Sequence, residues 1–127
     1  MRQDLFCDTN ALIRFLENDE TVVALLSNKR LAISVITEME MQCKPDINAN
    51  ERTLIREFLA YFDIIELTPA IRERTVKVRL STRLKLMDAI VGASAIEAGI
   101  PLVTADEKFS SLRGVDVIML PERSGNS

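Results

Sequence analysis

The sequence predicts an α/β domain in which helices cover both faces of a parallel sheet. Short apolar segments alternate along the chain with segments of helical periodicity. These short segments are almost continuously apolar, which is typical of parallel strands buried on both faces. The 127 residues correspond to one domain. We expect this domain over residues 1–120, followed by a flexible polar tail over residues 121–127.

Five segments are expected to form the strands, and each is bounded by polar or turn-forming residues. They lie at residues 5–7, 31–36, 64–67, 102–104 and 115–120. The connecting segments are expected to be helical. They lie at residues 9–17, 22–27, 51–61, 69–81 and 89–98, with another helix opening at residue 38 and a short turn or helix at 107–112.

Local signals support these helices. Apolar stripes at helical spacing comprise Ala11, Leu12, Phe15 and Leu16 in the first helix, and Leu54, Ile55, Phe58 and Leu59 in the helix at 51–61. Pro69 stands in the first turn of its helix, where proline is favoured. The helix at 89–98 is rich in small residues that permit close packing on a sheet, and Gly99 is a typical helix stop.

Composition narrows the possible chemistry. The chain has no histidine, which excludes histidine-based catalysis and histidine metal ligands. Its four glycines are scattered, so a glycine-rich phosphate loop is absent. We see no secretory signal that would suggest export, and no run of about 18 apolar residues that would suggest a membrane span. Cys7 and Cys43 form no paired motif, and we expect reduced thiols in a cytoplasmic protein.

The formal net charge of −3 disfavours nucleic acid as a partner. The basic residues are unevenly distributed, however. Six of the sixteen lie in one short segment: Arg72, Arg74, Lys77, Arg79, Arg83 and Lys85. This segment is either a solvated helix face or a surface that contacts phosphates.

Four acidic residues follow predicted strands or begin predicted helices: Asp8, Glu40, Asp88 and Asp106. Strands of a parallel sheet end at one edge, so most of these carboxylates are expected to meet there. Each could instead be a helix cap, and Thr37 with Glu40 fits a capping box. No cation lies next to Asp8 in sequence, so a cluster of acids there would need a bound cation to offset repulsion. Such a cluster suits Mg²⁺ or Mn²⁺.

Two other acids provide an internal comparison. Asp63 and Asp116 stand at the beginnings of predicted strands, and we expect them at the opposite edge of the sheet with ordinary structural roles.

Four segments together resemble the PIN-domain ribonucleases of bacterial and archaeal toxin–antitoxin pairs, the VapC-like toxins. They are residues 6–10 (FCDTN), 33–41 (ISVITEMEM), 86–95 (LMDAIVGASA) and 102–109 (LVTADEKF). The resemblance implies a three-layer α/β/α sandwich around a five-stranded parallel sheet. It also implies a homodimer that cuts RNA with Mg²⁺ or Mn²⁺ and is inhibited by an antitoxin protein.

The resemblance also assigns roles to residues. Asp8, Glu40, Asp88 and Asp106 would be the catalytic, metal-binding acids, with Glu40 preferred over Glu38. Two polar residues, Thr104 and Asn10, would support them. Contacts with RNA are expected from Arg72, Arg79, Arg83 and Lys85. The segment 41–45 (MQCKP) departs from the family pattern, which affects only expectations about substrate or antitoxin contacts.

Two other functions stay open at this point. A PIN-like fold could bind RNA or a protein without cutting, in which case the acids would be caps and would bind no metal. Phosphotransfer through an aspartyl-phosphate would fit a strand that ends in Asp8, but Asn10 stands where dehalogenase-like enzymes carry a second aspartate.

Overall fold

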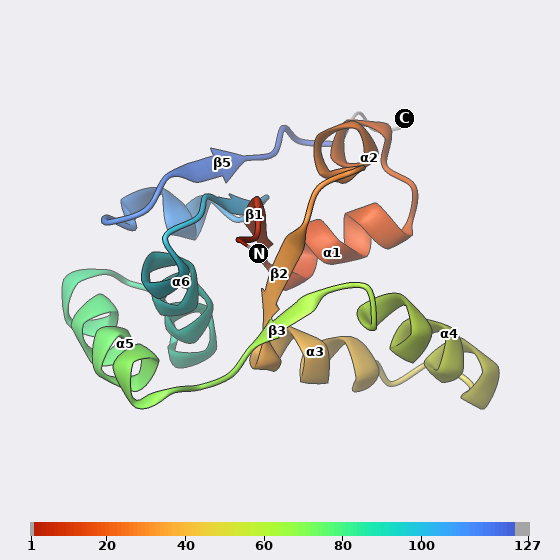
Figure 1. Ribbon diagram of the computed structural model, residues 1–127, viewed down its shortest axis with the longest axis horizontal. Helices are drawn as coiled ribbons and strands as arrows, with labels where there is room; N and C mark the ends of the chain where they lie inside the picture. The colour runs from red at the N-terminus through yellow and green to blue at the C-terminus, as the bar shows by residue number, and fades with distance from the viewer. Residues whose placement is uncertain (1, 124–127) are drawn as a thin grey trace.

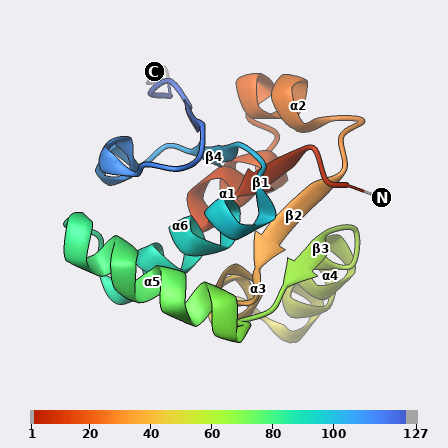
Figure 2. The same ribbon diagram turned by 60° about the vertical axis from the view of Figure 1, so that its left-hand side comes forward.

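The computed structural model describes residues 2–123. Its five strands are β1 (Leu5–Cys7), β2 (Leu31–Ser34), β3 (Asp63–Ile65), β4 (Leu102–Thr104) and β5 (Val117–Met119). Its helices are α1 (Thr9–Leu16), α2 (Glu20–Leu26), α3 (Val35–Gln42), α4 (Ala49–Leu59), α5 (Pro69–Ser81), α6 (Leu86–Ala98) and the 3₁₀ turn η1 (Glu107–Ser111). Figures 1 and 2 show how these elements are arranged.

All strands pair in parallel, in the order β3-β2-β1-β4-β5. The first three strands add to the sheet in one direction, and the chain then returns to place β4 on the other side of β1. The order therefore reverses between β1 and β4. In open parallel sheets, such a switch point leaves a crevice beyond the strand ends where ligands bind.

Helices cover both faces of the sheet, which confirms the predicted three-layer α/β/α fold (Figure 1). On one face α1, α2, α4 and Met41 of α3 pack against alternate strand residues such as Cys7 and Ile33. On the other face α5, α6 and Phe109 of η1 pack against Phe6, Ala32 and Leu102. Leu16 and Leu54 were expected in the apolar stripes but are exposed, so the buried stripes of α1 and α4 are narrower than predicted.

The boundary between β2 and α3 differs from the prediction. The strand ends at Ser34 instead of residue 36, and Ser34 caps α3 by accepting a hydrogen bond from the Ile36 amide at 3.0 Å. Thr37 therefore lies inside the first turn, and the predicted capping box of Thr37 and Glu40 is wrong. Val35 and Ile36 prolong the apolar run, so the sequence does not reveal where the strand becomes a helix.

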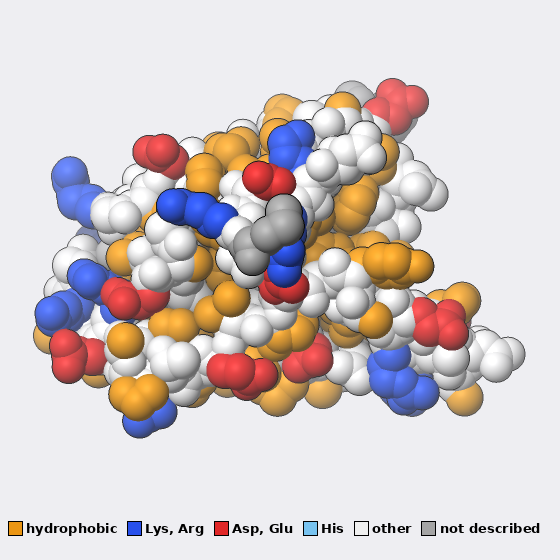
Figure 3. Space-filling view, viewed as in Figure 1, with side chains coloured by type: hydrophobic (Ala, Val, Ile, Leu, Met, Phe, Trp, Pro, Cys, Tyr) orange, Lys and Arg blue, Asp and Glu red, His pale blue; other side chains and the backbone are white. Residues whose placement is uncertain are grey.

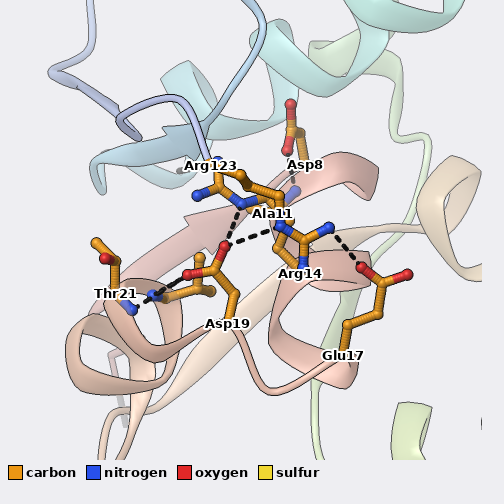
Figure 4. Close-up of polar contacts among 8 residues, drawn as sticks. Asp8, Ala11, Arg14, Glu17, Asp19, Thr21 and Arg123 are labelled. Carbon is orange, nitrogen blue, oxygen red and sulfur yellow. Dashed lines mark hydrogen bonds and ion pairs between the residues drawn. The ribbon is translucent and has the colours of Figure 1, made fainter. Parts of the chain in front are cut away.

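Ion pairs hold the corner between α1 and α2 (Figure 4). The nearly buried Arg14 donates to Asp19 at 2.8 Å, and Asp19 also caps α2. Arg123 pairs with both Asp19 and Glu17, which ties the end of the described chain to this corner. Residues 124–127 of the predicted tail lie outside the described residues. Within residues 2–123 no helix has the length and apolar character needed to cross a membrane.

Candidate active site

Asp8 lies at the switch point, directly after β1. Its backbone amide donates to the Val103 carbonyl of β4, so the aspartate is fixed between the two strands. One carboxylate oxygen caps α1 by accepting from the Ala11 amide at 2.8 Å. The other oxygen accepts a hydrogen bond from the Thr104 hydroxyl. Asp8 is thus both a helix cap and a buried acid held from the neighbouring strand, with 5% of its surface exposed.

Thr104 connects two of the acids. It is fully buried at the end of β4, where it donates to Asp8 and accepts from the Asp106 backbone amide at 3.0 Å. Asp106 in turn caps η1 by accepting from the Lys108 amide at 2.9 Å. One threonine hydroxyl therefore sets the relative positions of Asp8 and Asp106.

Asp88 and Glu40 come from two helices. Asp88 lies in the first turn of α6, which begins at Leu86 instead of the predicted residue 89 and lacks a side-chain cap at Lys85. Glu40 is the sixth residue of α3 and not, as the sequence suggested, in its first turn. Because Ser34 caps α3, Glu40 has no capping role there.

The sequence analysis missed Thr9, which holds Glu40. The Thr9 hydroxyl donates to the Glu40 carboxylate at 2.6 Å and lies 3.1 Å from the Thr37 hydroxyl. Residues 9 and 40 are far apart in sequence, and only the packing of α1 beside α3 joins them. Asn10, which was expected to support the site, lines the same pocket without a hydrogen bond to any of the four acids within residues 2–123.

The four acids line one small pocket of about 180 Å³, together with Thr9, Asn10 and Val91. Glu38 points elsewhere, to a hollow with Gln42 and Arg56. Figure 4 shows Asp8 at the start of α1, away from the ion pairs at the other end of that helix. None of the four acids forms an ion pair with another residue of the described range 2–123.

Burial and mutual repulsion shift the protonation of two of these acids. Burial raises the pKa of Asp8 to about 6, although the bonds from Thr104 and Ala11 act in the opposite direction, and the charges of Asp106 and Asp88 add to the increase. Burial also raises the pKa of Asp88, to which Asp106 contributes, whereas Lys108 and Lys85 counteract it. The pocket therefore carries a net negative charge, and none of its acids has an ion-pair partner within residues 2–123.

This donor set fits a hard divalent cation, because carboxylate oxygens are the ligands that Mg²⁺ and Mn²⁺ prefer. The acids are not yet arranged as a closed site: in residues 2–123, no three acidic or cysteine side chains are close enough to hold one ion. Asp8 and Asp106 are fixed by Thr104 and by caps, and Glu40 is held by Thr9, whereas the Asp88 side chain forms no hydrogen bond within residues 2–123.

The comparison residues lie at the opposite edge of the sheet. Asp63 begins β3, where it accepts hydrogen bonds from Arg30 and Gln3 that lower its pKa, and it pairs with Arg30 at 2.8 Å. Asp116 immediately precedes β5 and contributes its backbone carbonyl to Leu102. These ordinary roles are the ones predicted for both residues.

The expected RNA contacts are exposed but unequal. Arg79 donates to the Leu84 carbonyl and Arg72 to the Leu67 carbonyl, so both partly serve to hold loops beside α5. Lys85 is near enough to Asp88 to affect its pKa, and so is Lys108, which the sequence analysis did not select. Basic and acidic side chains are interspersed on the face in Figure 3, which shows no continuous basic surface there.

The fold and the site together define a three-layer α/β/α domain with an acidic pocket at the switch point of its sheet. Comparisons with known proteins identify the family to which this domain belongs. The family model described as "PIN domain" matches residues 5–115. The chain belongs to the PIN-domain family, as its four motifs predicted. Members of this family are nucleases, and they generally use divalent metals.

Several solved structures share this fold. A toxin–antitoxin complex from Klebsiella pneumoniae aligns with a TM-score of 0.78 and 32% identity, covering 91% of this chain and 96% of the other. VapBC2 from Rickettsia felis, bound to a promoter DNA fragment, aligns with a TM-score of 0.78 and 17% identity over 92% and 98% of the chains. VapBC-1 from nontypeable Haemophilus influenzae aligns with a TM-score of 0.77 and 18% identity, covering 91% of this chain and 96% of the other. A search of curated protein sequences gave no significant match.

Proposed function

We propose that this protein is a Mg²⁺- or Mn²⁺-dependent endoribonuclease that acts as the toxin of a toxin–antitoxin pair. The observation that carries this proposal is the convergence of Asp8, Glu40, Asp88 and Asp106 on one pocket without a compensating ion pair in the described chain. Burying Asp8 among other acids is unfavourable for folding alone. A bound cation that the acids share would offset this cost.

The pocket is suited to an ion and a phosphate. Organic ligands generally occupy cavities of roughly 300–1,000 Å³, whereas this pocket has about 180 Å³. Asp8 and Asp106 would hold the ion from the sheet, and Asp88 and Glu40 from the helices. When bound, Mg²⁺ or Mn²⁺ would lower the pKa of a coordinated water and offset the negative charge on the phosphodiester.

The chain's own residues would prepare this reaction. Thr104 keeps Asp8 and Asp106 at a fixed separation, so the sheet half of the site is preorganised. Lys85 and Lys108 flank Asp88 and would attract the phosphates on either side of the cleaved bond. Arg72, Arg79 and Arg83 would extend that attraction along α5 and the loop that follows it.

Two partners belong to the proposal. The resemblance to VapC-like proteins and the toxin–antitoxin neighbours support an antitoxin that covers the acidic pocket. A second copy of this chain is proposed as well. It is supported by Val76 and Leu80, which share one face of α5 with 59% and 83% of their surface exposed, and by the exposed Leu86 and Met87 at the start of α6.

Cleavage of RNA by the isolated protein tests the proposed activity. A structured RNA mixture is incubated with Mg²⁺, with Mn²⁺ or with chelator, and Asp8→Asn serves as the matched variant. We expect products that carry 5′-phosphates only with metal, and a loss of at least about 100-fold in Asp8→Asn. Equal cleavage by both proteins would exclude the acids from the chemistry. Saturable RNA binding by the original protein without any cleavage would favour a binding module instead.

A further inference from the structure

Glu40 is held by a chain of hydroxyl groups that no cap or sequence motif accounts for. Its carboxylate oxygen Oε1 lies 2.6 Å from the Thr9 hydroxyl, which lies 3.1 Å from the Thr37 hydroxyl. The three residues change from exposed to fully buried in the order Glu40, Thr9, Thr37. The chain of contacts thus runs from the solvent-facing acid into the interior, where α1 packs beside α3.

The direction of the two hydrogen bonds follows from the chemistry of the groups. An ionised carboxylate only accepts, and each threonine hydroxyl has a single proton to donate. Thr9 therefore donates to Glu40, and Thr37 must be the donor to Thr9. Hydrogen bonds aligned in this way polarise one another, and a bond to a charged acceptor is stronger than one between neutral groups.

This arrangement compensates for the position of Glu40. The side chain extends from the second turn of α3, is exposed and forms no ion pair with any residue from 2 to 123. Without a partner it would sample several rotamers, and ordering it when a ligand binds would cost side-chain entropy. The bond to Thr9 fixes Oε1 in advance, and no hydrogen bond from residues 2–123 occupies Oε2.

We propose that Thr9 and Thr37 are positioning residues that orient Glu40 toward a divalent cation in the pocket. This inference rests on the proposed function, because it assumes that Glu40 faces the ion. It assigns to Thr9 the supporting role that the sequence suggested for Asn10, and it makes the contact between α1 and α3 part of the site. Partners that orient metal ligands in this way typically contribute 10- to 100-fold to affinity.

The test compares Thr9→Val with Thr9→Ser in calorimetric titrations with Mn²⁺. Valine keeps the shape of threonine but lacks the hydroxyl, whereas serine keeps the hydroxyl. We expect Thr9→Val to weaken Mn²⁺ binding by about 10-fold or more, and Thr9→Ser to stay within about threefold of the original protein. Thr21→Val, in the first turn of α2 and outside the pocket, is the control for valine at a helix start and should bind Mn²⁺ normally.

A second pair of variants tests the buried end of the chain. Thr37→Val leaves the Thr9–Glu40 bond in place but removes the hydroxyl that donates to Thr9. We therefore expect a smaller loss of Mn²⁺ affinity, about threefold, and Thr37→Ser should bind Mn²⁺ like the original protein. This pair also keeps the proposal testable if Thr9→Val fails to fold. Loss of affinity in the serine variants as large as in the valine variants would indicate a packing effect and overturn the assignment.

A measurement without metal tests the bond itself. In urea unfolding, Thr9→Val should raise the equilibrium constant for unfolding severalfold in the original protein. In a Glu40→Ala background the same substitution should raise it much less. Additive effects would show that the two side chains do not interact. Unchanged Mn²⁺ affinity in Thr9→Val, with binding lost in Asp8→Asn, would overturn this inference but leave the proposed function intact. Absence of saturable Mn²⁺ binding in the original protein would overturn both.

Discussion

Asp8 has two tasks that conflict when no cation is present. It caps α1 through Ala11 and accepts from Thr104, which both favour the ionised carboxylate, yet it is buried beside Asp88 and Asp106, which disfavour the charge. Burial is the larger effect, and the pKa rises to about 6. A residue selected for stability alone would not need the charge. The conflict is therefore the clearest indication, at the residue scale, that this position serves a ligand.

The raised pKa predicts how Asp8→Asn changes stability with pH. The folded protein holds the Asp8 proton more tightly than the unfolded chain, so this group favours folding below the unfolded pKa of 3.8 and loses that contribution as pH rises through about 6. At pH 7 without metal, Asp8→Asn should therefore be more stable by roughly 1–3 kcal/mol.

Urea unfolding at several pH values checks this prediction. The advantage of Asp8→Asn should shrink as pH falls from 7 to 4. Adding Mn²⁺ should stabilise the original protein and leave Asp8→Asn nearly unchanged, because only the folded original protein binds the ion. A variant that is less stable than the original protein at pH 7 in chelator would show that the capping role outweighs the cost of the buried charge.

The start of α6 brings charged residues of both signs together. Asp88 stands in its first turn, Lys85 precedes it, and Lys108 of η1 is close enough to affect the same acid. The arginines of α5 precede this region in the sequence, but two of them donate hydrogen bonds to nearby backbone carbonyls. At the scale of elements, Lys85 and Lys108 at the starts of α6 and η1 are thus better placed than the basic face of α5 to contact a phosphate near the acidic pocket.

We expect Lys85→Gln and Lys108→Gln to weaken RNA binding more than Arg72→Gln. Each lost phosphate contact should reduce the slope of log K against log salt by about 0.7 and lower affinity without a preference for sequence. Fluorescence titrations with a labelled RNA at several salt concentrations, in chelator to prevent cleavage, measure this slope. A larger effect from Arg72→Gln would instead indicate that RNA follows α5.

At the scale of the whole molecule, topology decides which acids can act together. Both edges of the sheet carry aspartates at strand ends, but the edge at the β1–β4 switch point gathers several acids in one pocket, and none of them has an ion-pair partner within residues 2–123. At the other edge Asp63 is neutralised by Arg30. The two edges provide matched tests within one protein.

Asp88→Asn and Asp106→Asn should each lower metal-dependent cleavage by about 100-fold or more, whereas Asp63→Asn and Asp116→Asn should change it less than about twofold. Steady-state cleavage of one RNA with all four variants provides the comparison, and circular dichroism confirms that each is folded. A loss of activity in Asp116→Asn as large as in Asp106→Asn would show that position at the acidic edge is not what matters.

The sequence by itself determined the order of strands and helices, the layered α/β class and the four acidic positions, because hydrophobic periodicity and residues at strand ends are local properties. It misplaced the end of β2, since Val35 and Ile36 are apolar whether they continue a strand or begin a helix. It therefore attributed a capping role to Glu40 that Ser34 makes unnecessary. Such errors arise wherever one local pattern is compatible with two structures.

Only the tertiary structure decided which side chains meet. The pairing of β1 with β4 brings Thr104 to Asp8, and the packing of α1 on α3 brings Thr9 to Glu40, across 96 and 31 residues of sequence. The tertiary structure also showed that Asn10 forms no hydrogen bond with the four acids within residues 2–123, and that Lys108 lies near Asp88. The physical reason is that hydrogen bonds and charge interactions act over a few ångströms, and chain folding alone sets those distances.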